Sequence, residues 1–156
     1  MEIASISEIK QELKHLPPET LQQHIIRLTK FKKENKELLN YLLFEAGNED
    51  FFIQKVKEEI DEQFLNLNRS SMYLAKKTLR KVLRTVHKYI RFSGNKETEI
   101  ELLIYFCKKM KTSKLNYRHN RVVFNMYINQ MKRINKVLTV LHEDLQYDYK
   151  EQLESL

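Results

Sequence analysis

The chain has 156 residues, and its 28 Lys and Arg against 21 Asp and Glu give a formal net charge of +7. With two glycines, two prolines and one cysteine, it lacks the turn residues that sheets need and cannot form a disulfide framework. No apolar run approaches the roughly 20 residues that span a bilayer, and the polar N-terminal stretch is unlike a signal peptide. We therefore expect a cytoplasmic, all-α protein without a membrane partner.

The first third of the chain predicts three short helices, over about residues 3–15, 18–30 and 34–47. Pro17 and Pro18 separate the first two, because proline ends one helix and suits the first turn of the next. The third helix carries apolar residues all round its wheel, and we expect it to be buried on more than one side. These residues are Leu38, Leu39, Tyr41, Leu42, Leu43 and Phe44.

Two longer amphipathic helices follow. Asn48 can cap the first, whose predicted buried stripe is Ile53, Val56, Ile60, Phe64 and Leu67. The second starts at Ser70 or Ser71, stops at Gly94, and is roughly 35 Å long. Its predicted buried side is Met72, Ala75, Leu79, Val82, Leu83, Val86 and Ile90. Basic residues occupy the opposite side, so we interpret this helix as a core element with one solvent-exposed, cationic face.

The remaining residues predict a nearly all-apolar helix over 97–110, a polar connection over 112–117 and a helix over 118–142 with a broad apolar face. The acidic tail, 143–156, forms a last helix or frays. Cys107 lies in the apolar helix, and we interpret it as a buried structural thiol.

Residues 24–46 align with residues 88–110 without a gap when the chain is shifted by 64 positions, and both segments carry the motif ELLxY. Such a match arises by chance from helical composition or indicates a helical repeat. We expect a single domain over 1–156, built as a short right-handed stack of helical hairpins. A compact multi-helix bundle is the alternative.

No pattern indicates catalysis. Gly47 and Gly94 are isolated, so a glycine-rich phosphate loop is absent, and the five histidines lack the spacing of metal ligands. The acidic cluster Glu58, Glu59, Asp61 and Glu62 is interpreted as a solvated face. We therefore expect a non-enzyme with no catalytic residues, no cofactor and no metal site, and keep an unrecognised enzyme as an alternative.

Charge is distributed unevenly along the chain. No acid occurs between Glu62 and Glu97 or between Glu101 and Glu143, and these windows hold most of the basic residues. If the helices over 70–92 and 118–142 turn their polar faces the same way, they form a surface suited to a polyanion such as nucleic acid. The candidates are Lys77, Arg80, Lys81, Arg84, Lys88, Arg91, Arg118, His119 and Arg121. The last three would also lie at a helix start, whose amides favour phosphate. The alternative is an ordinary solvated surface.

The sequence does not specify a function directly. The favoured hypothesis is a non-enzymatic helical interaction module that presents a protein-binding surface to an unidentified protein partner. Tyr73, Tyr89, Phe92 or Tyr117 could anchor a peptide there. Nucleic-acid binding through the basic face is the second hypothesis, and a homo-oligomer is also open.

Overall fold

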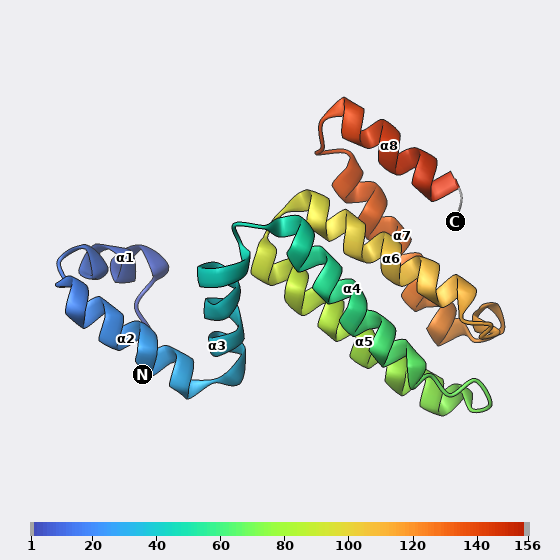
Figure 1. Cartoon of the computed structure of the whole chain (residues 1–156), viewed down its shortest axis with the longest axis horizontal. Coiled ribbons are helices and arrows are strands. Elements are labelled where there is room, and N and C mark those ends of the chain that lie inside the picture. The colour runs from blue at the N-terminus through green and yellow to red at the C-terminus, as the bar shows by residue number, and fades with distance from the viewer. Residues whose placement is uncertain (1, 155–156) are drawn as a thin grey trace. The chain divides into compact units, whose positions relative to one another are not determined.

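The computed structural model describes residues 2–154, in which every regular element is a helix and no strand occurs. The predicted all-α class is confirmed. The helices are α1 (Ile6–Lys14), α2 (Pro18–Phe31), α3 (Lys33–Asn40), α4 (Glu49–Leu65), α5 (Met72–Ser93), α6 (Lys96–Thr112), α7 (Arg121–Leu138) and α8 (Glu143–Glu154), with a π turn, η1 (Tyr41–Glu45), and a 3-10 turn, η2 (Tyr117–His119) (Figure 1). By their contacts they form two compact units, Met1–Phe44 and Glu45–Leu156.

The N-terminal unit follows its local sequence signals. Ser5 accepts a hydrogen bond from the amide of Glu8, and the Glu8 carboxylate accepts one from the amide of Ser5 at 2.7 Å. This capping box starts α1 because it satisfies two amides that have no partner inside the helix. Pro17 and Pro18 separate α1 from α2 as predicted, and α2 packs against α3.

The expectation that residues 34–47 are buried on several sides is wrong. Within the described part of the N-terminal unit only Tyr41 is buried, and Leu42, Leu43 and Phe44 are 55%, 62% and 77% exposed. The helix widens into the π turn η1 at Tyr41, which changes the angular step between successive residues. An apolar run shows that side chains can be buried, but α3 packs mainly against α2, and the fold leaves Leu42, Leu43 and Phe44 exposed.

In the second unit, α4 and α5 form an antiparallel hairpin, and α6 and α7 form another (Figure 1). The α6 helix packs against α4, α5 and α7, which explains why its sequence is apolar on nearly every side. Its buried residues include Ile100, Leu103, Phe106 and Cys107. This pairing suits a hairpin stack and equally a multi-helix bundle.

The α5 helix matches its prediction closely. Ser71 accepts a hydrogen bond from the Leu74 amide at the start, and Gly94 ends the helix with φ of +66°, a conformation that glycine adopts without a Cβ clash. Five of the seven predicted core residues are buried, namely Ala75, Leu79, Val82, Val86 and Ile90. The predicted stripe of α4 is buried as well, over Ile53, Val56, Ile60, Phe64 and Leu67.

The C-terminal boundaries differ from the prediction. The helix expected over 118–142 covers only Arg121–Leu138, because Asn120 caps it and residues Tyr117–His119 form the separate turn η2. The connection expected to be polar buries Leu115 and Tyr117. The tail forms helix α8. Residues 155 and 156 of the predicted tail lie outside the described residues.

Both segments of the proposed repeat, 24–46 and 88–110, are helix–turn–helix. Their environments differ, since Leu102 and Leu103 are buried whereas Leu38 and Leu39 are half-buried. The repeat and the single domain over 1–156 stay predictions. None of the helices in the described residues is long and apolar enough to cross a membrane.

Candidate binding groove between α5 and α7

An open groove of about 430 Å³ runs along the second unit between α5 and α7. Arg80, Leu83, Arg84 and His87 line it from α5, and Met126 lines it from α7. The α5 residues recur at intervals of three and four, which places them along one edge of the helix. Leu83 and Met126 supply apolar surface, while the arginines supply positive charge. We call this surface the α5–α7 groove.

The arginines of the groove have no acidic partner. Arg80 and Arg84 are exposed, and neither forms an ion pair with any carboxylate of residues 2–154. The nearby α4 helix is rich in acids, yet several of its carboxylates are engaged elsewhere. Tyr89 of α5 donates to Glu59 at 2.6 Å, and Asp61 accepts from Tyr105 of α6 at 2.7 Å.

These bonds correct one interpretation. Within the acidic cluster of α4, Glu58 and Glu62 are solvated as expected, but Glu59 and Asp61 are only partly exposed and bridge α4 to its neighbours. Lys109 of α6 adds an ion pair to Asp61 at 2.9 Å. The acids thus stabilise helix packing and leave the guanidinium groups of the groove unneutralised.

A buried polar network fixes the groove wall. The His87 ring nitrogen Nε2 lies 3.0 Å from Oε1 of Gln130, whose Nε2 donates to the carbonyl of Met126 at 3.1 Å. The contact from His87 is to Oε1 of Gln130, an amide oxygen that can only accept, so the His87 ring proton belongs on Nε2. Burial lowers the pKa of His87, and the nearby Arg133 and Arg91 charges lower it further. His87 is therefore neutral at pH 7 in the empty groove.

Glu99 anchors α7 to α6 beneath this network. Its side chain is 8% exposed and accepts from Arg133 at 2.7 Å and from Lys96 at 2.9 Å. Burial acts to raise the pKa of Glu99, but the hydrogen bonds from Lys96 and Arg133 and their charges outweigh it and hold the pKa below its ordinary value. The two groove helices are therefore set in place by a satisfied polar cluster as well as by apolar packing.

The structure gathers some predicted basic candidates and separates others. Arg80 and Arg84 share the groove, and Arg91 is exposed two to three turns farther along α5. Lys81 instead lines a depression with Glu58, Glu59 and Glu62 of α4. The ammonium of Lys77 lies 4.7 Å from the Tyr73 ring centroid, and that of Lys88 lies 4.4 Å from the Tyr89 ring centroid.

The other three candidates lie off α5. Arg118 and His119 are exposed on η2, and Arg121 is the exposed first residue of α7. The expected phosphate-binding helix start stays a prediction, and Asn120 Oδ1 already accepts from the amides of Val122 and Val123 at 3.2 Å each. A capped helix start offers fewer free amides to an anion.

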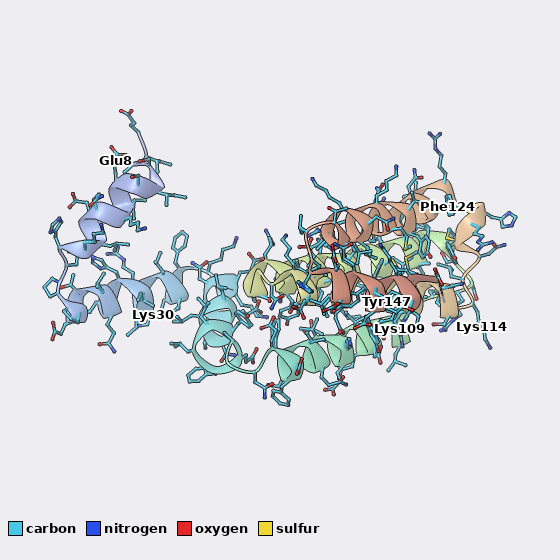
Figure 2. All side chains as sticks on the ribbon, turned by 90° about the horizontal axis from the view of Figure 1, so that it is seen from above. Glu8, Lys30, Lys109, Lys114, Phe124 and Tyr147 are labelled. Atoms are coloured by element: carbon cyan, nitrogen blue, oxygen red, sulfur yellow. The ribbon has the colours of Figure 1, made fainter. Side chains whose placement is uncertain are left out.

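The predicted aromatic anchors differ in exposure. Tyr73 is 62% exposed, whereas Tyr117 is 7% exposed and therefore cannot anchor a peptide. Tyr89 and Phe92 are half-buried and pack edge to face with ring centroids 5.7 Å apart. Phe124 of α7, labelled in Figure 2, is 36% exposed and was not among the anchors expected from sequence.

Catalytic groups do not gather around the groove. Cys107 is buried as predicted, and burial raises the pKa of its thiol to about 12, so it is a poor nucleophile. Among residues 2–154, no group of three or more His, Cys, Asp and Glu side chains could hold a metal ion.

Sequence reasoning missed the part of the groove that depends on tertiary contact. His87 was considered only as one of five histidines without the spacing of metal ligands, Leu83 was assigned to the core, and Met126 was not singled out. His87 and Gln130 are 43 residues apart, so no local periodicity signals that they meet. No protein-family model, curated protein or solved structure matches the chain.

Proposed function

We propose that the chain is a non-enzymatic interaction module that binds an acidic, amphipathic protein segment in the α5–α7 groove. The observation that carries this proposal is the pairing of an apolar floor, Leu83 and Met126, with two exposed arginines that form no ion pair with the described carboxylates of residues 2–154. An amphipathic helix places its apolar side chains in such a groove and its carboxylates on the rim. Arginine suits this role because its planar fork pairs with a carboxylate through two hydrogen bonds.

Met126 supports the same proposal, because the unbranched, polarisable side chain of methionine adapts to differently shaped apolar anchors. His87 can add a positive charge when its ring is protonated. A bound carboxylate next to the ring favours the imidazolium form, so binding takes up a proton and strengthens as the pH falls towards 6.

The test uses a panel of fluorescein-labelled helical peptides, each with glutamates on one face and Leu, Phe or Tyr as the apolar anchor. We expect at least one peptide to bind, by fluorescence anisotropy, with a dissociation constant on the order of 10 μM. The double substitution Arg80→Glu and Arg84→Glu weakens that binding about tenfold or more.

The matched control reverses two exposed lysines outside the groove, Lys111→Glu and Lys132→Glu, and thus changes the net charge equally. It leaves binding within about twofold, apart from the general effect of charge on association rate. Failure of every peptide to bind, or equal losses in the two variants, would contradict the proposal.

A second candidate is nucleic-acid binding, favoured by the row of exposed, unpaired cations along α5. Lys77, Arg80, Arg84 and Arg91 lie within one sector of this helix and none makes an ion pair. Retention of a labelled 20-base-pair duplex that falls steeply between 50 and 200 mM salt would support it. Retention that survives charge reversal at Arg80, Arg84 and Arg91 would remove it.

A further inference from the structure

The C-terminal helix α8 carries the charge that the groove lacks. It contains five carboxylates and one lysine, in the order EDLQYDYKEQLE. Its carboxylates make no ion pair with the basic residues of α5 or α7; the one pair that α8 makes joins Asp144 to the neighbouring His142 at 3.4 Å. The second unit therefore presents an unneutralised cationic groove and an unneutralised acidic helix.

The two sides of α8 have different roles. Tyr149 is 6% exposed, and burial together with Glu101 and Glu97 of α6 raises its pKa to about 12, so this side lies against α6. Tyr147, labelled in Figure 2, is 71% exposed. A step of two residues rotates about 200° around a helix, so the two tyrosines point in nearly opposite directions.

Tyr147 stands in the middle of the acidic face of α8. Asp144 and Glu151 are three and four residues from it, the spacing at which side chains share one face. Asp148 follows Tyr147 directly and is four residues after Asp144 and three before Glu151, and all three carboxylates are exposed. An exposed tyrosine with three carboxylates and one lysine, Lys150, close to it offers an aromatic anchor for Leu83 and Met126 and acids for the arginines.

We propose that the occupant of the α5–α7 groove is α8 of a second copy of this chain. The inference rests on the proposed function, since it assigns the partner of the same groove. We place the two copies about a twofold axis, so that each copy's α8 lies in the other's groove and the assembly closes as a dimer. Tyr147 of each copy enters the groove of the other, between Arg80 and Arg84, and Asp148 and Glu151 pair with those guanidinium groups.

Nucleic acid fits the groove less well. Single strands bind where bases stack on aromatic rings, and the groove lining of Arg80, Leu83, Arg84, His87 and Met126 contains no Phe, Tyr or Trp. Two contacts, each by a helix about 18 Å long, form a small interface. We therefore expect a weak dimer with a dissociation constant on the order of 10 μM.

The experiment is sedimentation velocity on the full chain from 1 to 200 μM at 100 mM salt. The wild type is expected to shift towards a species of twice the 19.0 kDa chain mass as concentration rises. The groove variant is Arg80→Glu with Arg84→Glu, and it places acids in the groove opposite the acids of α8. The α8 variant is Asp148→Lys with Glu151→Lys, and it places lysines opposite the groove arginines. Each is expected to weaken dimerisation about tenfold or more, whereas the control variant Lys111→Glu with Lys132→Glu dimerises like the wild type.

The decisive sample is an equimolar mixture of the groove variant and the α8 variant. In the mixed dimer the reversed groove meets the reversed α8, and the native groove meets the native α8, so both contacts are attractive again. Restored dimerisation in the mixture supports the proposal, provided that far-UV circular dichroism shows both variants folded.

A wild type that stays monomeric at 200 μM overturns this inference, and so does a mixture that fails to dimerise. A monomer that still binds the acidic peptide panel through Arg80 and Arg84 leaves the proposed function intact, and the two failures are thus distinguishable. A wild type that dimerises only when a DNA duplex is present also overturns it.

Discussion

Removing Arg133 tests whether the polar cluster under the groove holds α6 and α7 together. In Arg133→Met the Glu99 carboxylate, 8% exposed, keeps only the hydrogen bond from Lys96, whose side chain is 55% exposed. Breaking a fully buried ion pair costs about 3–5 kcal/mol. Since Arg133 is 37% exposed and Lys96 remains, we expect a loss of about 2 kcal/mol in the free energy of unfolding.

The measurement is urea unfolding at pH 7 followed by circular dichroism at 222 nm, with the m-value checked for two-state behaviour. The double variant Glu99→Leu and Arg133→Met removes both charges and is expected to recover about 1 kcal/mol or more of the loss. Lys132→Met, an exposed neighbour on the same helix, is the control and stays within about 0.5 kcal/mol of the wild type.

The effect also has a predicted pH dependence. Because the folded pKa of Glu99 lies below its unfolded value, this group stabilises the fold above the unfolded pKa, and the stabilisation is lost as pH falls through the folded pKa. A protonated Glu99 is neutral and no longer forms an ion pair with the Arg133 guanidinium. The difference in free energy of unfolding between wild type and Arg133→Met therefore shrinks from pH 6 to pH 3. A loss under about 0.5 kcal/mol at pH 7, or one that does not change with pH, would refute the reasoning.

Three further predictions concern the second unit and its turns. Leu79→Ala empties a fully buried site and costs about 3 kcal/mol in urea unfolding, whereas Leu65→Ala, at a site 82% exposed, stays within about 0.5 kcal/mol. Gly94→Ala costs about 1 kcal/mol because the residue has φ of +66°, while Gly47→Ala, which meets no atom within 4 Å and lacks positive φ, is neutral or stabilising. Cys107 reacts with a thiol reagent at pH 8 only after urea unfolds the chain, since burial raises its pKa; fast reaction of the native protein would contradict this.

The sequence predicted those helices in which every local signal agrees. In α5 the cap at Ser71, the stop at Gly94 and the apolar period of the intervening residues all indicate one element, and the structure has that element within a residue or two. The failures come where the geometry departs from a regular helix. Leu42–Phe44 lie in the π turn η1 and are exposed, because an apolar run does not show whether the fold supplies a neighbour to cover it. Tyr117 is buried in a 3-10 turn within a connection that was expected to be polar.

The groove could be predicted only in part, for a similar reason. Arg80 and Arg84 are visible because they repeat along one face of one helix. The groove floor needs Met126, which lies more than 40 residues away on a helix whose rotation relative to α5 the sequence does not encode. The same holds for His87, whose partner Gln130 becomes apparent only once α5 and α7 are placed side by side.

Net charge alone is a poor guide to this surface, because it does not show which carboxylates are engaged in contacts between helices. Glu59, Asp61 and Glu99 each stabilise a helix contact through a tyrosine, a lysine or an arginine from another element or turn. Among the exposed charges that make no such helix contact are Arg80, Arg84 and Arg91 of α5 and the acids on the outer face of α8. The twofold pairing that we propose brings these two groups of charges together, so we expect the affinity between copies to decline with added salt.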